Sequence, residues 1–357
     1  MKRVATALAI ASLAIASRAI ASRALASALA LTLAFGMQAA TAQTLKAVKD
    51  RGQLICGANG TLAGFGLPDP QGNWTGFDVD FCRAIAAAIF NDPTKVKFVP
   101  LTAADRFTAL QSGEIDVLSR NTTWTMSRDT SLGIDFAAVN FYDGQGFMVR
   151  KSLKVNSALE LNDAAVCVQQ GTTTELNLAD YFRANTMSLK TVTFATADEA
   201  VKAYDTSRCD AYTTDSSALY GERLRLSDSS AHVVLPEIIS KEPLSPAVRQ
   251  GDDNWEDIVR WTHHAMINAE ELGINQKNVD AMLKSSAPDI RRLLGVEGQF
   301  GDALGLTNDW AYRIIKAVGN YGESFERNVG QGSPLKIARG LNALWTKGGL
   351  QYGLPVR

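Results

Sequence analysis

The sequence is poor in the residues and patterns that metal sites and nucleic-acid surfaces need. Its 357 residues include only three histidines and four cysteines, and its 36 basic and 37 acidic side chains nearly balance. The cysteines have none of the C-x-x-C spacing of zinc sites. His263 and His264 are adjacent in an apparent helix, where neighbouring side chains point about 100° apart, so they do not suit one metal ion. We therefore expect no metal ion and no cofactor, and the absence of basic clusters argues against nucleic acid as a partner.

Outside the N-terminal segment, the sequence also lacks any run that is apolar enough to cross a bilayer. Residues 1–42 combine basic side chains, no acidic one, an apolar run over 24–35 and a small-residue cleavage pattern that ends at Ala42, before Gln43. This is the pattern of a secretory signal peptide. The apolar run is too short and too rich in Ala and Ser for a convincing membrane span, and a retained membrane anchor is the alternative. The basic residues are Lys2, Arg3, Arg18 and Arg23.

The rest of the chain is acidic and has an even number of cysteines. Removing residues 1–42 leaves 315 residues and takes away the four positive charges, so the net charge goes from −1 to −5. This length predicts two domains. Four cysteines in an exported chain predict two disulfides, with three possible connectivities. No cysteine closely follows the signal segment, which argues against a lipid anchor. We expect a periplasmic protein that is not embedded in the membrane.

Strands and helices alternate in the first part of this segment. A strand over 53–58 is followed by a helix over 77–90, whose start Asp78 or Asp80 would cap. The next elements are a strand over 95–101, a helix over 104–113 and a strand over 114–119. Such alternation predicts an α/β fold with a mostly parallel sheet.

The same pattern then starts again. The runs "ALQSGEIDVLSRN" (109–121) and "AYDTSRCDAYTTD" (203–215) correspond, each with a helix end leading into a strand that finishes on polar residues. The runs "CGANGT" (56–61) and "CVQQGT" (167–172) also correspond, in the same order. Two matches in one order predict two lobes of related architecture.

Two extended segments without a helical period, 136–152 and 232–248, would cross between these lobes. A helix near 254–271 follows the second crossing, so we expect the chain to return to the first lobe, with two hinge crossings. The predicted division is a signal peptide over 1–42, lobe 1 over 43–141 and 242–357, and lobe 2 over 142–241. A C-terminal extension from about 280, with a helical stretch over 309–328, is expected to pack on the outside of lobe 1.

Polar loops follow the strand ends in both lobes. In open α/β sheets, ligands bind beyond the carboxyl ends of the strands. In lobe 1 this place is taken by "SRNTTWTMSR" (119–128), and in lobe 2 by "QQGTTTE" (169–175) and "TTD" (213–215). Facing each other across a hinge, these loops would offer complementary chemistry to one small zwitterion.

One set of side chains in these loops suits an anion. Arg128 offers a planar fork for a carboxylate. Thr172 as N-cap and Glu175 three residues later form a capping-box pattern, and the free N–H groups of such a helix start favour an anion. Thr173 would add a hydroxyl.

A second set suits the ammonium group. Asp215, directly after a strand, would bind it, and Asn121 and Thr123 would complete the contacts to both charges. Each residue has an ordinary alternative, with Arg128 in a structural ion pair, Asp215 as a helix cap and Trp124 as a packing residue. Their joint placement at strand ends of both lobes favours a binding site.

Four long runs carry a resemblance to a known family. They are "GNWTGFDVDFCRAIAAAIF", "ADRFTALQSGEIDVLSRNTTWTMSRD", "VCVQQGTTTELNLADYF" and "CDAYTTDSSAL". They resemble the bacterial periplasmic amino-acid-binding proteins of ABC importers, solute-binding protein family 3, and more closely the general L-amino-acid-binding branch. The resemblance covers residues 44 to about 275. It implies a type II periplasmic-binding-protein clamshell, a monomer that closes on an L-amino acid and then docks on an ABC permease, without catalysis.

The resemblance also implies roles for the loop residues. Arg128 would bind the ligand α-carboxylate, helped by Thr123 and by the helix start at Thr173. Asp215 would bind the α-ammonium, helped by the carbonyl of Asn121.

The side-chain pocket would be lined from the first loop by Asn59, Leu62 and Phe65. Relatives that bind basic amino acids have an acidic residue where Asn59 stands here, so a preference for Lys, Arg or His is not expected. A neutral pocket edged by Asn59, Arg120 and Trp124 fits a broad range that includes Glu, Gln and Asp.

Pairing within each lobe assigns the disulfides as Cys56–Cys82 and Cys167–Cys209. The resemblance supports the second pair in particular, since it makes the two strands concerned neighbours.

Two other functions are compatible with the sequence. Some dehydratases that act on cyclic carboxylates, such as prephenate or arogenate, resemble this fold with an added general acid, which a carboxylate or a lysine could supply. However, none of His232, His263 and His264 lies in a loop expected to face the cleft, and no nucleophile–base pair stands out. The second is a sensor domain, which a transmembrane helix and a signalling domain would normally follow in the same chain.

Overall fold

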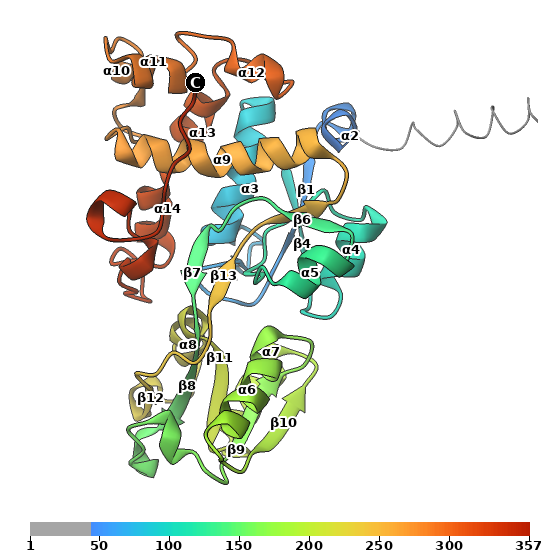
Figure 1. Cartoon of the computed structure of the whole chain (residues 1–357), viewed down its shortest axis with the longest axis vertical. Helices are drawn as coiled ribbons and strands as arrows, with labels where there is room; N and C mark the ends of the chain where they lie inside the picture. Colours follow the sequence, from blue (N-terminus) through green and yellow to red (C-terminus); the bar gives the residue numbers. More distant parts are fainter. Residues whose placement is uncertain (1–43) are drawn as a thin grey trace, which may run out of the picture. The chain divides into compact units, whose positions relative to one another are not determined.

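Two five-stranded sheets organise residues 44–357, which are the residues that the structure, a computed structural model, describes (Figure 1). The signal peptide expected over 1–42 and its cleavage point lie outside the described residues. In spatial order, the first sheet contains β4 (Val96–Pro100), β1 (Leu54–Ala58), β5 (Val117–Leu118), β14 (Ala247–Arg249) and β6 (Ile134–Phe136). The second contains β10 (Lys190–Phe194), β9 (Ala165–Gln169), β11 (Ala211–Asp215), β8 (Gln145–Arg150) and β12 (His232–Val234). We call the elements around the first sheet lobe 1 and those around the second lobe 2.

The two sheets have the same topology. β1 pairs in parallel with β4 and β5, as β9 does with β10 and β11. The fourth strand of each sheet, β14 or β8, runs antiparallel to both of its neighbours. The repeated sequence runs form equivalent strands, β1 with β9 and β5 with β11. This confirms the expected pair of related α/β lobes, and each sheet is mixed, with two parallel and two antiparallel pairings.

Helices cover both sheets. Lobe 1 contains α2 (Thr44–Arg51), α3 (Phe77–Phe90), α4 (Arg106–Ser112), α5 (Met126–Ser131) and α9 (Asp253–Glu271). Lobe 2 contains α6 (Thr173–Ala184), α7 (Ala197–Asp205) and α8 (Ser216–Arg223). Helix α3 has the predicted bounds, and β1, β4, α4 and α9 each lie within two residues of theirs. The strand expected over 114–119 is shorter, because only Val117 and Leu118 pair with β1 as a ladder.

The predicted capping of α3 by Asp78 or Asp80 is wrong. The N-cap is Gly76, with φ 138° and no side-chain cap. A Cβ there would lie 2.1 Å from the carbonyl oxygen of Phe65, so no side chain fits. Asp78 instead accepts a hydrogen bond of 2.8 Å from the backbone N–H of Asn121. Asp80 accepts hydrogen bonds from side chains of α14 (Tyr321–Asn328).

The C-terminal extension completes the core of lobe 1. Besides α14, its helices are α10 (Val279–Met282), α11 (Pro288–Leu293), α12 (Phe300–Ala303) and α13 (Trp310–Val318). The stretch predicted as one helix over 309–328 is therefore two helices. Gly319, at φ 90°, ends α13, and Asn320 starts α14 in a capping box with Glu323. Trp310 and Ile314 of α13 are buried in the same core as α3 and α9, so the extension is part of the core of lobe 1.

Two crossings connect the lobes, as predicted. The first contains β7 (Phe141–Asp143) and the second β13 (Glu242–Leu244). These strands pair antiparallel, with Tyr142 opposite Pro243, and lie side by side in Figure 1. The hinge is therefore a short two-stranded ribbon.

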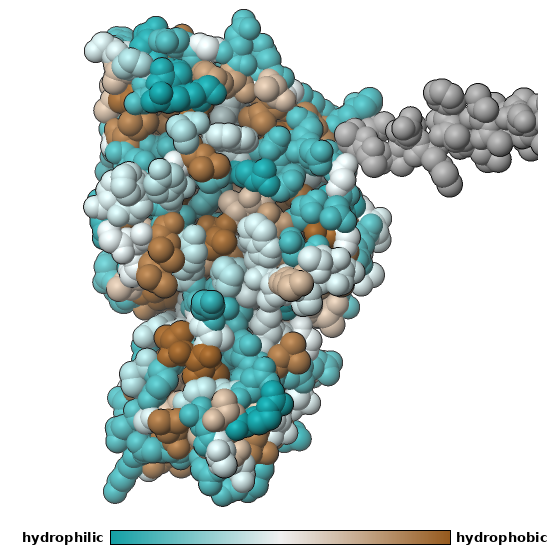
Figure 2. Space-filling model, in the orientation of Figure 1, coloured by the Kyte–Doolittle hydropathy of each residue, from teal (hydrophilic) through white to brown (hydrophobic). Residues whose placement is uncertain are grey.

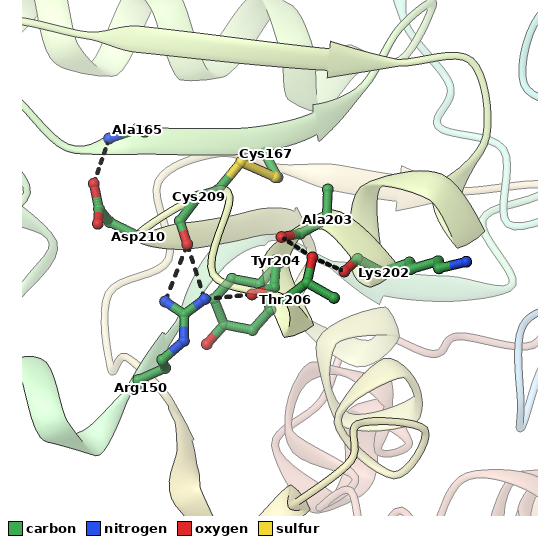
Figure 3. The surroundings of a disulfide bond; sticks show 9 residues. All are labelled: Arg150, Ala165, Cys167, Lys202, Ala203, Tyr204, Thr206, Cys209 and Asp210. Carbon is green, nitrogen blue, oxygen red and sulfur yellow. Dashed lines mark hydrogen bonds between the residues drawn. A yellow bond between two sulfur atoms is a disulfide. The ribbon is translucent and has the colours of Figure 1, made fainter.

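Each lobe contains one disulfide, and both are the expected pairs. Cys56 of β1 is joined to Cys82 of α3, and Cys167 of β9 to Cys209. Figure 3 shows the second bond beside the guanidinium of Arg150, which donates hydrogen bonds to the carbonyl oxygens of Cys209 and Tyr204. The segment before β11 is thus fixed both covalently and by an arginine from β8.

The surface shows no broad apolar band on the face seen in Figure 2. Apolar side chains there form small separate groups among polar ones. Within residues 44–357, no helix has the length and apolar character needed to cross a membrane.

Candidate ligand-binding site

A cavity lies between the lobes, beyond the carboxyl ends of strands from both sheets. The space that the centre of a water molecule can occupy there is about 40 Å³. The lining residues from lobe 1 are Asn59, Leu62, Arg106, Arg120, Asn121 and Thr123. Those from lobe 2 are Gln169, Thr172, Thr173, Thr174, Ala197, Tyr212, Thr214, Asp215, Ala218 and Glu222. The cavity is at the place where the fold predicts a ligand.

Most of the predicted ligand residues meet at this cavity. The predicted residues that line it are Asn59, Leu62, Arg120, Asn121, Thr123, Thr173 and Asp215. Arg128 does not line the cavity. Its Nη1 donates a hydrogen bond of 2.9 Å to the carbonyl oxygen of Thr123, which does. The structure does not bring Phe65 and Trp124 to the cavity wall. Phe65 packs edge-on against Phe141 in the core, and Trp124 stacks on Phe136 at 5.5 Å between ring centroids.

Three buried arginines surround the lobe 1 side of the cavity: Arg106, Arg120 and Arg128. None of them forms an ion pair with a carboxylate of residues 44–357. Arg120 Nε donates to the carbonyl oxygen of Leu101 at 2.8 Å, and the buried Nε of Arg106 has no hydrogen-bond partner among the described residues. Burial lowers the pKa of all three, that of Arg120 to about 10. Buried cations without a counterion are costly, so this side of the cavity favours an anion.

Carboxylates gather on the opposite side. Asp215, at the end of β11, is 6% exposed and lines the cavity. It occupies the N-cap position of α8 without capping it. Burial raises the pKa of Asp215 well above its usual range, and the neighbouring carboxylates of Asp143 and Glu242 raise it further, while Arg106 and Arg128 oppose them. A carboxyl group in this situation would gain from a cation placed beside it.

Two other carboxyl groups, one in lobe 2 and one in the hinge, also have a raised pKa. Glu222 lines the cavity and forms an ion pair with Arg225 at 2.8 Å, and burial raises its pKa to about 7. Asp143, on β7, accepts hydrogen bonds from the backbone N–H and hydroxyl of Ser217, and burial raises its pKa to about 6. Lobe 1 therefore contributes arginines to the cavity lining and lobe 2 contributes the carboxyl groups of Asp215 and Glu222, which suits a ligand with both charges.

The loops that carry these groups are held by specific contacts. Asn121 adopts a positive φ of 34°, which its backbone hydrogen bond to Asp78 helps to fix. Its side chain accepts a hydrogen bond of 2.9 Å from Asn59. In lobe 2, Thr172 caps α6 as predicted, accepting from the N–H of Glu175 at 3.2 Å. The carboxylate of Glu175 accepts from Gly171 instead of from Thr172, so only half of the predicted capping box forms.

Sequence reasoning missed Arg106, Glu222 and Glu242. Arg106 is the first residue of α4, directly after the loop that follows β4, so its position at a strand's carboxyl end could have identified it. Glu242 gives no such signal, because it lies in a crossing strand. Its carboxylate accepts hydrogen bonds from the hydroxyls of Thr123, at 2.6 Å, and Thr173, at 2.8 Å.

A second, larger cavity adjoins the first. It shares Asn59, Arg120, Gln169 and Ala197 with it, and the space open to the centre of a water molecule is about 200 Å³. Its other lining residues are Thr61, Pro100, Leu101, Thr102, Thr196 and Asp198. The site thus continues past Arg120, away from Thr123 and Thr173.

Comparisons with known proteins agree with this architecture. The chain is 65% identical over 330 residues to the general L-amino acid-binding periplasmic protein AapJ of Rhizobium johnstonii, covering 92% of this chain and 97% of that one. It is 57% identical over 320 residues to the glutamate/glutamine/aspartate/asparagine-binding protein BztA of Rhodobacter capsulatus, covering 89% and 95%. Among solved structures, a periplasmic binding protein of an ABC transporter from Brucella ovis, with glutathione bound, matches with a TM-score of 0.88 and 65% identity. The match covers 88% of this chain and all of that one.

These matches confirm the expected type II clamshell of two lobes. The model of the family described as bacterial extracellular solute-binding proteins, family 3, matches residues 54–279. That range contains both sheets, both crossings and every residue that lines the cavity. The chain therefore belongs to the family 3 bacterial extracellular solute-binding proteins.

Proposed function

We propose that this protein captures L-amino acids in the periplasm and delivers them to an ABC permease, without chemical conversion. Ligand burial would shift an equilibrium between open and closed lobes, and the closed form would dock on the permease. The observation that carries the proposal is the charge pattern of the cavity. Three buried arginines without ion pairs face Asp215, whose carboxylate accepts no hydrogen bond from residues 44–357.

The two charges of an α-amino acid match this pattern. Arg128 would bind the α-carboxylate, with Thr123 and the start of α6 at Thr173. Asp215 would bind the α-ammonium, with the Asn121 carbonyl. Pairing both charges away from water gives an expected affinity of micromolar or better, about −8 kcal/mol or more favourable.

The same cavity indicates the range of side chains. Asn59 and Arg120 lie where the two cavities meet, and an amide and a guanidinium suit carboxylate or amide side chains. Arg106 adds a further positive charge. Two relatives are named for general L-amino acids and for glutamate, glutamine, aspartate and asparagine. We therefore expect a broad range that includes Glu, Gln and Asp.

A second candidate ligand class is favoured by the larger cavity. Glutathione, present in the Brucella ovis structure, contains a γ-linked glutamyl residue whose α-carboxylate and α-ammonium are both free. That end would occupy the first cavity, and the rest of the peptide would extend past Arg120 into the space of about 200 Å³.

The finer organisation is also part of the proposal. Residues 1–42 would be removed as a signal peptide, and the mature protein would act as a monomer. Lobe 1 would comprise residues 43–141 and 242–357, and lobe 2 residues 142–241, with β7 and β13 at the two boundaries.

A thermal melt tests the proposal directly. The mature chain, refolded to remove carried-over ligand, is measured with common L-amino acids, D-isomers, glutathione, sugars and prephenate. Ligand at about 100 times Kd should stabilise the protein by roughly 2.7 kcal/mol. Shifts with many L-amino acids and none with sugars would support the proposal. No shift with any of these compounds would overturn the proposal, and a shift with prephenate alone would overturn it and favour a dehydratase-like enzyme.

A further inference from the structure

We propose that Glu242 is an internal carboxylate that competes with the ligand's α-carboxylate for the hydroxyls of Thr123 and Thr173. Glu242 would thereby set the affinity of the site and its tolerance for ligands without an α-carboxylate. This inference rests on the proposed function, since it assumes that an amino acid binds in the cavity between the lobes.

Glu242 is fully engaged by donors from both lobes and from the hinge. Its Oε2 accepts from Thr123 Oγ1 at 2.6 Å, in lobe 1, and from Thr173 Oγ1 at 2.8 Å, in lobe 2. Its Oε1 accepts from Asn177 Nδ2 at 2.6 Å and from Ser240 Oγ at 2.7 Å. The residue is 1% exposed. One carboxylate thus connects loop 119–125, helix α6 and the second crossing.

The two hydroxyls cannot serve Glu242 and a second carboxylate at once. A hydroxyl has one proton to donate, and in this structure both Thr123 and Thr173 donate it to Glu242. Their oxygens lie 3.4 Å apart and both residues line the cavity. A ligand carboxylate that binds these hydroxyls must therefore take at least one of them from Glu242.

The negative charge of Glu242 opposes binding of a ligand carboxylate to these hydroxyls. A bound α-carboxylate would lie beside Glu242, and like charges placed together cost several kcal/mol unless cations balance them. Arg106 and Arg128 are the nearby cations, and Asp143 and Asp215 are further nearby carboxylates. Asp143 is the residue opposite Glu242 in the β7–β13 ribbon. Glu242 therefore adds negative charge to the part of the site where an anion is expected.

The variant Glu242→Gln keeps the side-chain shape and removes the charge. Binding is measured by titration calorimetry with two ligands, L-glutamine and its α-carboxamide, which has no carboxylate at that end. We expect Glu242→Gln to bind L-glutamine at least about tenfold more tightly than the wild type, because the repulsion is lost. The α-carboxamide should show no such gain.

A control separates this effect from a general loss of charge in the hinge. Glu237→Gln, on the same crossing and outside the lining of both cavities, should leave both affinities unchanged. Ser240→Ala removes one donor to Glu242 Oε1, which leaves the charged Glu242 more dependent on the hydroxyls of Thr123 and Thr173, so it should weaken L-glutamine binding. This second variant keeps the inference testable if Glu242→Gln fails to fold.

The results separate this inference from the proposed function. Weaker or unchanged binding of L-glutamine by a folded Glu242→Gln, or an equal gain with both ligands, would overturn the role of Glu242. In that case binding of L-glutamine by the wild type would still support an amino-acid site. If the wild type binds no amino acid at all, the proposed function itself fails.

Discussion

Arg128 links the predicted carboxylate site to the loop that forms it. Its Nη1 holds the carbonyl oxygen of Thr123, and its remaining donors have no ion partner among the described residues. Replacing it removes both the counter-charge and the support of the loop. We expect Arg128→Met to weaken binding of L-glutamate by about 2–5 kcal/mol, because the buried ligand carboxylate would be left unpaired. Titration calorimetry measures this loss.

Arg128→Lys is the matched control, since it retains the charge and loses the planar fork. It should bind more weakly than the wild type but better than Arg128→Met. Near-normal affinity of Arg128→Met would remove this residue from the site.

Asp215 should make binding depend on pH. Its pKa is raised well above 3.8 by burial and by Asp143 and Glu242, so part of the free protein carries a protonated Asp215 as the pH falls. A ligand ammonium favours the ionised form, so binding releases a proton and weakens as the pH is lowered through the raised pKa. Calorimetry over a series of pH values, in two buffers of different ionisation heat, should give different apparent enthalpies at the pH values where the proton is released. The difference should be smaller in Asp215→Asn, and equal heats for the wild type at every pH would contradict this assignment.

For single residues, a position directly after an apolar strand was the feature of the sequence that predicted the binding site. Arg120, Asn121 and Thr123 follow an apolar strand directly, so their place at the cavity could be predicted from the chain itself. Glu242 could not, because its position depends on the pairing of β13 with β7, a contact between distant segments. Trp124 follows the same strand but turns to stack on Phe136, since its ring has more to gain from burial there than beside a polar ligand.

Among the elements, helix α3 depends most on the residue before it. Gly76 has φ 138°, and a Cβ there would lie 2.1 Å from a backbone oxygen that has little freedom to move. We expect Gly76→Ala to destabilise the protein by about 1–3 kcal/mol or more, through backbone strain and the clash together. Urea denaturation measures this change.

Gly72→Ala is the control for the clash. Gly72 also has a positive φ, 84°, but nothing lies within 4 Å of a Cβ there. It should show only the smaller cost of the backbone conformation, about 1 kcal/mol. Equal effects of the two variants would mean that the contact with Phe65 does not matter.

Element boundaries were predictable where local chemistry decides them. The bounds of α3 followed from its apolar pattern. The break between α13 and α14 was missed because the apolar period continues through it, although Gly319, Asn320 and Glu323 together form a stop and a capping box. Asp78 and Asp80 were misassigned as caps, since their partners Asn121 and Arg327 are brought close only by the tertiary fold.

For the whole molecule, the disulfides should stabilise each lobe by restricting its unfolded chain. The sequence separations are 26 for Cys56–Cys82 and 42 for Cys167–Cys209. In the chain-entropy model these loops correspond to about 3.5 and 4 kcal/mol. We expect a chain lacking Cys167 and Cys209 to lose stability by about this amount in denaturant titration, slightly more than one lacking Cys56 and Cys82. A reductant should then have no further effect on a chain that lacks all four, and an unchanged midpoint in either variant would refute the estimate.

The two-lobed design was predictable because the sequence repeats its strand-end runs, and the equivalent strands occupy equivalent places in the two sheets. The role of the C-terminal extension was not. Its amphipathic helices show which sides are apolar, but nothing local identifies α3 and α9 as their partners. Packing between distant elements was the part that the chain itself did not reveal.

The ribbon of β7 and β13 has a consequence for engineering. Phe141 pairs with Leu244 and Asp143 with Glu242, so the chain leaves lobe 1 and re-enters it at adjacent points. The segment between these two points forms lobe 2, and its two ends lie side by side in the paired strands. Segments with neighbouring ends tolerate excision and replacement. Lobe 2 of a relative could therefore be spliced between these strands, which would exchange half of a binding site while leaving the other half and the C-terminal helices as they are.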